Sequence, residues 1–201
     1  MDKSLNRARN SKEFRALSFL IYFFAILGIL TLCYWASFFC QAHAYQNRAL
    51  RTFGKTAALP QQPVPYPRAG SGIAILSIPR LGMSSLVVEG TDGDELKVAP
   101  GHIAGTALPG SAGNIGIAGH RDTFFRPLRN IRIGDIITLA TPERTIQYRV
   151  ASTEIVLPRN VGVLNRTVQQ TLTLVTCYPF SFIGSAPKRF IVHAICDNCG
   201  Q

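Results

Sequence analysis

Charged residues are scarce in this chain of 201 residues: they make up 16% of it, whereas hydrophobic residues make up 47%. Disordered chains show the opposite balance, so disorder is excluded for most of the length. The five cysteines are too few and too scattered for a small disulfide-rich scaffold. Glycine (17) and proline (12) are close to their average share, which excludes collagen-like and low-complexity architectures.

The longest stretch without charge lies near the N-terminus, where no Lys, Arg, Asp or Glu occurs between Arg15 and Arg48. As a helix, the apolar run 16–39 would be about 36 Å long, enough to cross a hydrocarbon core of about 30 Å. The run is about twice as long as the apolar core of a cleaved signal peptide, which favours an uncleaved anchor. We therefore predict a transmembrane helix over residues 16–40.

The basic residues around this run indicate its orientation. Five of them precede it and three follow it, which predicts a cytoplasmic tail over residues 1–15. Residues 41–71 then form an extracytoplasmic linker, whose Pro-rich part at 59–68 is typical of a stiff spacer. The predicted location is the cell membrane, crossed once, with the folded domain of residues 72–201 outside the cytoplasm.

The domain from residue 72 onward shows a pattern of short strands separated by turn signals, with no helix of ten residues or more. The predicted strands cover residues 73–78, 85–89, 114–118, 136–140, 145–150, 154–157, 171–176 and 189–195. We expect an all-β domain of eight strands with short helices. Both a barrel and a sandwich fit this pattern, and closure into a barrel would leave no exposed strand edge.

Two of these strands end in residues that can carry chemistry. Cys177 follows the most β-prone run, directly before Tyr178–Pro179, and His120 follows another strand. A cysteine and a histidine at a common rim are the minimum for a thiol nucleophile with a proton-transfer partner. Arg189 opens the last strand and offers a permanent cation for an oxyanion. Taken singly, each also fits an inert cysteine, a structural histidine or a solvated cation.

The amino-acid sequences around these three residues favour a catalytic role over a structural one. His120 lies in Gly113–Leu128, which follows Pro100–Gly110, while Cys177 lies in Thr171–Phe180 and Arg189 in Lys188–Val192. From about residue 72 to 196, and in the order His, Cys, Arg, these segments resemble the sortase family of cysteine transpeptidases. The continuation after the cysteine is most similar to class D sortases.

The resemblance implies a membrane-anchored transpeptidase built on an eight-stranded barrel. Such an enzyme cleaves a C-terminal sorting signal of the Leu-Pro-x-Thr-Gly type through a thioacyl intermediate, here on Cys177. His120 would protonate the departing amine and later deprotonate the incoming one. Arg189 would stabilise the oxyanion or hold the signal's backbone, and Thr176 would assist in the oxyanion hole. The implied partners are exported proteins that carry the signal, and an amine of a wall precursor or of a protein.

An acidic cluster raises the question of a metal, because some sortases bind calcium in a comparable loop. The cluster consists of Glu89, Asp92, Asp94 and Glu95. Its spacing differs from that of an EF-hand loop, and capping of a short helix explains the last two carboxylates. We therefore expect no calcium and no other cofactor.

Two further histidines are interpreted as structural. His193 follows Arg189 by four residues, so it lies on the same strand face but about 13 Å further along. It is expected to pack or to lie at the rim. His102, in Pro100-Gly-His, is interpreted as a turn residue.

Two rival functions follow from the remaining features. The Cys196-x-x-Cys199 pair lacks the second ligand pair of a zinc site and fits a local disulfide, or a membrane-tethered thiol–disulfide oxidoreductase. That enzyme would need the motif at a helix N-terminus in a βαβ setting.

Alternatively, the 16 basic and 9 acidic residues beyond residue 42 fit a non-enzymatic domain that binds the envelope. No nucleic-acid-binding motif accompanies this charge, so we expect no nucleic-acid partner.

Overall fold

The computed structural model describes residues 20, 22–37, 66–181, 184–197 and 199. The chain divides into two compact units, Met1–His43 and Ala44–Gln201. In the first unit, residues 22–37 are helical. Among the described residues, no helix combines the length and the apolar character that a membrane span requires.

The predicted anchor lies only partly within the described residues. Both ends of the span 16–40 fall outside them, as do the tail 1–15 and most of the linker 41–71. These three assignments therefore stay predictions.

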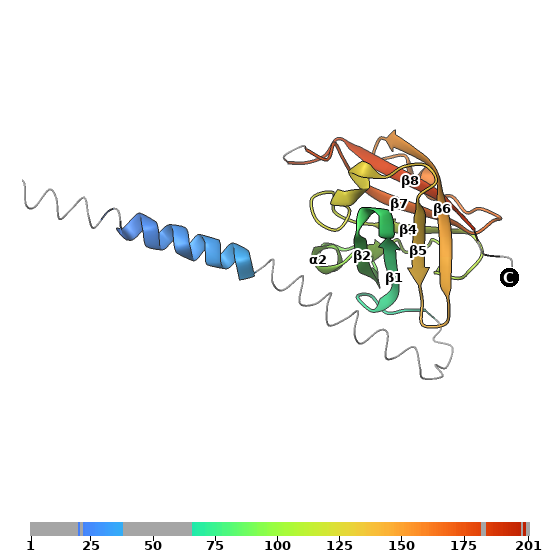
Figure 1. Cartoon of the computed structure of the whole chain (residues 1–201), viewed down its shortest axis with the longest axis horizontal. Helices are drawn as coiled ribbons and strands as arrows, with labels where there is room; N and C mark the ends of the chain where they lie inside the picture. The colour runs from blue at the N-terminus through green and yellow to red at the C-terminus, as the bar shows by residue number, and fades with distance from the viewer. Residues whose placement is uncertain (1–19, 21, 38–65, 182–183, 198, 200–201) are drawn as a thin grey trace, which may run out of the picture. The chain divides into compact units, whose positions relative to one another are not determined.

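The described residues of the second unit form eight strands and a few short helical turns (Figure 1). The strands are β1 (Gly72–Ile78), β2 (Met83–Glu89), β3 (Gly101–His102), β4 (Asn114–Ala118), β5 (Ile136–Ala140), β6 (Thr145–Val156), β7 (Thr171–Tyr178) and β8 (Lys188–Cys196). The helical turns are η1 (Pro79–Leu81), α2 (Gly93–Val98), η2 (Arg126–Asn130) and η3 (Val161–Leu164).

The strands close into a barrel in the order β1-β2-β3-β4-β7-β8-β6-β5. Neighbours run antiparallel except for two parallel pairs, β2 with β3 and β4 with β7. The second of these pairs places a strand from the first half of the domain beside one from its last third. The predicted all-β architecture is confirmed, and of the two arrangements that the pattern allowed the chain adopts the barrel.

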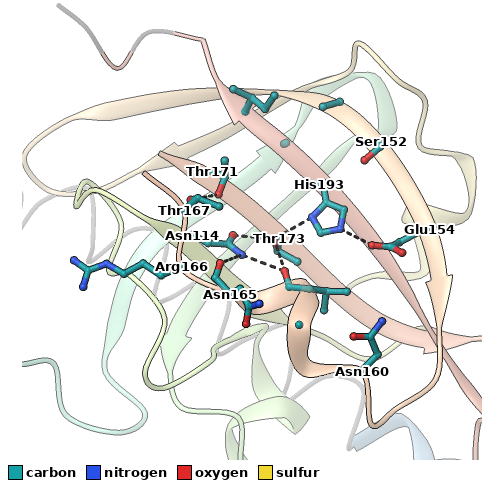
Figure 2. A pocket seen from close by; sticks show the side chains of 15 residues that line it. Asn114, Ser152, Glu154, Asn160, Asn165, Arg166, Thr167, Thr171, Thr173 and His193 are labelled. Carbon is teal, nitrogen blue, oxygen red and sulfur yellow. Dashed lines mark hydrogen bonds and ion pairs between the residues drawn. The ribbon is translucent and has the colours of Figure 1, made fainter. Parts of the chain in front are cut away.

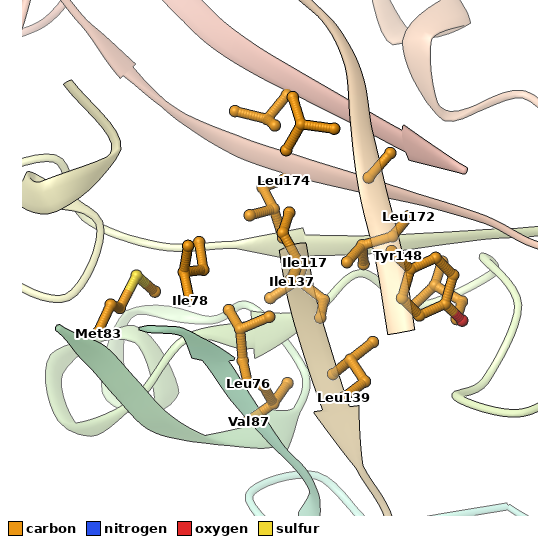
Figure 3. Packing of buried hydrophobic residues seen from close by; sticks show 14 of the residues in the cluster. Leu76, Ile78, Met83, Val87, Ile117, Ile137, Leu139, Tyr148, Leu172 and Leu174 are labelled. Carbon is orange, nitrogen blue, oxygen red and sulfur yellow. The ribbon is translucent and has the colours of Figure 1, made fainter. Parts of the chain in front are cut away.

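Alternate side chains of the strands fill the barrel (Figure 3). Leu172 and Leu174 of β7 pack there with Ile137 and Leu139 of β5, and all four are completely buried. Burying each such side chain contributes roughly 1.5–3 kcal/mol to the free energy of unfolding. This alternation leaves the intervening residues of each strand on the outer face.

The strand count agrees with the prediction only because two errors cancel. The segments 145–150 and 154–157 are one strand, β6, which continues through a bulge in its pairing with β8 near Ala151. A bulge interrupts the in-and-out alternation, so the sequence reads as two strands. The strand that was missed is β3, whose two residues are too few to show any period.

Candidate active site

The parallel pair of β4 and β7 brings the candidate nucleophile and the candidate base to one rim. In the pairing register, Ala118 lies opposite Val175. The pairing continues past the end of β4, because the amide of Gly119 donates to the carbonyl oxygen of Val175 over 3.1 Å. Two residues beyond Ala118 and Val175, in the same register, lie His120, just past the end of β4, and Cys177, the last residue but one of β7. The parallel register therefore places these two residues on neighbouring strand ends.

The third candidate comes from the strand on the other side of β7. Arg189 of β8 lies directly opposite Cys177 in the antiparallel register. Its Nη1 atom donates to the carbonyl oxygens of Ala186, over 3.3 Å, and Lys188, over 3.0 Å. Within the described part of the chain, no carboxylate pairs with this guanidinium group. Its other N–H groups therefore remain able to bind an oxyanion or a peptide carbonyl.

The thiol lies on the outside of the barrel. Leu172 and Leu174 of β7 point inward, so the alternation of the strand places Cys177 on the outer face. The cysteine is half-buried and not disulfide-bonded, and His120 is exposed. A peptide can therefore reach both groups from solvent.

Thr176, which the sequence interpretation placed in the oxyanion hole, faces the other way. It is buried, and its hydroxyl group donates to the carbonyl oxygen of Gly119 over 2.7 Å. This hydrogen bond ties the residue before the candidate nucleophile to the residue before the candidate base.

The interpretation of His102 as a turn residue is wrong, because His102 belongs to β3 and is completely buried. Its Nδ1 atom lies 2.7 Å from the buried carboxylate of Glu89. Its Nε2 atom lies 2.9 Å from the hydroxyl of Thr106 and 3.0 Å from the carbonyl oxygen of Ala107. The Thr106 hydroxyl in turn accepts the amide of Gly116 in β4. Polar pairing across β2 and β3 fixes this histidine, and a sequence window cannot show such pairing.

His193 lies apart from the candidate catalytic residues, in a pocket of about 530 Å³ on the outer face of β7 and β8 (Figure 2). Its Nε2 atom lies 2.9 Å from Glu154 and its Nδ1 atom 3.3 Å from the hydroxyl of Thr173. Thr173 donates to the side-chain oxygen of Asn114 over 2.8 Å. None of the three candidate catalytic residues lines this pocket. This hydrogen-bond network therefore holds His193 away from the candidate catalytic rim, as its spacing from Arg189 led us to expect.

The acidic residues that we considered as a calcium site, and rejected, are partly engaged elsewhere. Glu89 pairs with His102, and Asp94 accepts a hydrogen bond from Lys97 over 2.7 Å. That hydrogen bond lowers the pKa of Asp94. Among the described residues, no group of three potential ligands is placed to hold a metal ion.

Cys196 and Cys199 are joined by a disulfide at the end of β8. The pair follows a strand of the barrel and not a βαβ unit, and in the described region no helix begins at either cysteine. The oxidoreductase alternative lacks the helix N-terminus that would lower the pKa of a reactive thiol.

A family model and several known proteins match the chain. The family model described as a sortase domain matches residues 76–196, more than half of the chain. The chain belongs to the sortase family. The resemblance seen in the sequence is thereby confirmed, and the matched residues include all three candidate catalytic positions.

Individual sortases resemble the chain to different extents. Sortase D of Bacillus subtilis is 36% identical over 128 residues, which are 63% of this chain and 65% of that protein. Sortase SrtE1 of Streptomyces coelicolor is 32% identical over 158 residues, which are 69% of this chain and 45% of that protein. The solved structure of a Clostridium perfringens sortase D5 transpeptidase has a TM-score of 0.69 at 28% identity, over 76% of this chain and 98% of that chain. The chain thus spans less than two thirds of either curated sortase, and two of the three relatives are D-type sortases, as predicted.

Proposed function

We propose that the chain is a cysteine transpeptidase that cleaves a C-terminal sorting signal of the Leu-Pro-x-Thr-Gly type and transfers the exported protein to an amine. The observation that carries this proposal is the order of three neighbouring strand ends, with Cys177 between His120 and Arg189. A nucleophile, a proton carrier and a permanent cation then surround a single position on the outer face.

In the first half-reaction, Cys177 reacts as a thiolate while His120 is protonated, and the sulfur attacks the carbonyl carbon of the signal's threonine. The carbonyl electrons move to oxygen, and Arg189 stabilises the resulting oxyanion. When the C–N bond breaks, His120 donates a proton to the departing amine. The products are a thioacyl-enzyme and the released C-terminal fragment.

In the second half-reaction, an amine attacks the thioacyl carbon. Its nitrogen forms the new C–N bond and passes a proton to His120, while the C–S bond breaks and the Cys177 sulfur leaves as a thiolate. Thr176 acts through its hydrogen bond to Gly119 and holds the two reacting strand ends in register. We assign it this positioning role in place of direct oxyanion support.

The location follows from the N-terminal sequence. A charge-free run over residues 16–40, preceded by five basic residues, supports a single span with residues 1–15 in the cytoplasm. The barrel would then act outside the cytoplasm on exported proteins held at the same membrane.

Peptide turnover by matched pairs of variants tests the proposal. Cleavage of Leu-Pro-x-Thr-Gly peptides, with hydroxylamine as acceptor, is compared for wild type, His120→Ala and Arg189→Ala. We expect losses of about 10²–10³-fold or more. The matched controls are His193→Ala for the histidine and Lys188→Ala for the basic residue. Both remove a side chain of β8 that we do not place in catalysis, so both variants should retain activity. Equal losses in the catalytic and control variants would contradict the assignment.

A further inference from the structure

A second pocket, of about 960 Å³, opens beside the candidate catalytic rim. We call it the arginine pocket. Its lining includes three arginines and three aromatic residues: Arg121, Arg126, Arg129, Tyr178, Phe180 and Phe190.

The arginine pocket adjoins all three candidate catalytic residues. Arg121, Tyr178 and Phe190 line it, and each directly follows one of these residues in the chain. Neighbouring residues of a strand point to opposite sides, so Tyr178 and Phe190 point away from the outer face that carries the thiol. The arginine pocket therefore lies on the other side of the rim. It is therefore separate from the face of β7 on which a peptide would meet the nucleophile.

The charge of the arginine pocket is predominantly positive. Arg126 and Arg129 are both exposed and lie three residues apart in η2, so they project from the same side of this 3-10 turn. Within the described residues, neither guanidinium group has an ion-pair partner. Asp122 is the one carboxylate among the lining residues. Guanidinium groups bind carboxylates and phosphates through paired N–H donors, so this pocket suits an anionic group.

Arg121 and the three aromatic residues of the arginine pocket are held in place by a hydrogen bond and by ring contacts. Arg121 donates from Nη2 to the carbonyl oxygen of Gly184 over 2.8 Å, which links the segment after His120 to the segment after β7. Tyr178, Phe180 and Phe190 contact one another with ring centroids 5.4–6.4 Å apart. An apolar wall beside cationic groups can hold the body of a small molecule and its negative end at the same time.

We propose that the arginine pocket binds the negatively charged group of the incoming amine, so that the acceptor's amine approaches the thioacyl carbon past His120. This inference rests on the proposed function and names its second substrate as an amine that carries a carboxylate or a phosphate. The side of approach follows from the chemistry, because His120 must take the proton that the attacking amine loses. The bonds made and broken are those of the second half-reaction above.

The test uses the full-length protein and matched pairs of acceptors. The thioacyl-enzyme is formed with a cleavable peptide, and acceptors are then compared by kcat/KM for product formation. Gly-Gly is paired with Gly-Gly amide, and phosphoethanolamine with ethanolamine, so each pair differs in one anionic group. We expect the wild type to use at least one anionic acceptor about tenfold better than its neutral partner.

Charge-removing variants locate the effect. Arg126→Gln/Arg129→Gln should abolish the preference for the anionic acceptor and leave turnover of the neutral acceptors and thioacyl formation unchanged. Arg68→Gln, an exposed arginine outside the pocket, should keep the preference. A preference for Gly-Gly alone would assign the pocket to a carboxylate, and a preference for phosphoethanolamine alone would assign it to a phosphate.

Three outcomes separate the two proposals. If no peptide forms a thioacyl-enzyme, the proposed function itself fails. If the thioacyl-enzyme forms but wild type uses charged and neutral acceptors equally, only the arginine pocket inference is overturned. It is likewise overturned if the double variant loses activity equally toward charged and neutral acceptors, because the arginines would then not recognise the charge.

Discussion

The hydroxyl group of Thr176 donates a hydrogen bond to the carbonyl oxygen of Gly119 over 2.7 Å, inside the barrel. These two residues directly precede the proposed nucleophile and the proposed proton carrier. The geometry of the reacting pair, which lies on the outer face, is therefore fixed by a buried contact between β7 and the end of β4.

Replacing Thr176 with valine removes this contact while keeping the shape of the side chain. The Gly119 carbonyl would be left buried without its partner, at a cost of about 1–3 kcal/mol in the free energy of unfolding. Thioacyl formation should slow at saturating peptide, with little change in KM, because alignment and not binding is impaired. Thr176→Ser keeps the hydroxyl and should restore the rate. A serine variant as slow as the valine variant would exclude the positioning role.

His102 and Glu89 form a buried pair, and removing one partner alone should be costly. His102→Ala leaves the carboxylate of Glu89 buried without the imidazole, which should lower the free energy of unfolding by about 3–5 kcal/mol. The double variant Glu89→Ala/His102→Ala should lose less than the sum of the two single variants. Urea denaturation measures all three, and strictly additive losses would show that the two side chains do not interact.

Asp135 predicts how the barrel responds to acid. Arg80 donates from Nε and Nη2 to the two carboxylate oxygens, and the amide of Arg132 donates over 2.8 Å. The hydrogen bonds from Arg80 hold the pKa of Asp135 below its ordinary value of 3.8. A lowered pKa in the folded state stabilises the protein above the unfolded value, and this contribution is lost as the pH falls through the folded value.

The matching measurement is thermal unfolding between about pH 5 and about pH 3. Wild type should lose more stability over this interval than Asp135→Asn, which has no carboxylate to protonate. Asp197→Asn removes an exposed carboxylate that pairs with Arg149 and should leave the pH dependence close to that of wild type. Parallel curves for wild type and Asp135→Asn would contradict the proposed linkage.

The disulfide between Cys196 and Cys199 is predicted to be dispensable for catalysis. It closes a loop of four residues at the end of β8, away from the rim that carries Cys177. Cys199→Ser should therefore cleave peptides at the wild-type rate. Inactivity of this variant, together with an unchanged unfolding midpoint, would favour the oxidoreductase alternative instead.

The sequence predicted the parts of the fold that depend on local pattern. Continuous or alternating apolar runs marked most strands, and the positions of His120 and Cys177 at strand ends predicted a common rim. The pairing of β4 with β7 joins segments about fifty residues apart, and no local signal encodes it. The family resemblance supplied the order of the candidate catalytic residues, and the strand register brings these three residues to neighbouring strand ends.

What the sequence could not predict depends on burial. His102 reads as a turn residue because glycine and proline precede it, yet its partners come from β2 and from the segment before β4. The arginines of η2 are spaced like any solvated pair, and only the folded chain brings them beside Tyr178 and Phe190. The bulge near Ala151 likewise hides the continuity of β6.

The most direct test of the central claim is the intact mass of the full-length protein after incubation with a pool of Leu-Pro-x-Thr-type peptides. We predict an adduct equal in mass to the N-terminal part of one peptide, absent from Cys177→Ala and released by hydroxylamine. The absence of an adduct with every peptide, from a folded protein whose Cys177 also resists alkylation, would contradict the claim. An adduct that persists in Cys177→Ala would contradict it equally.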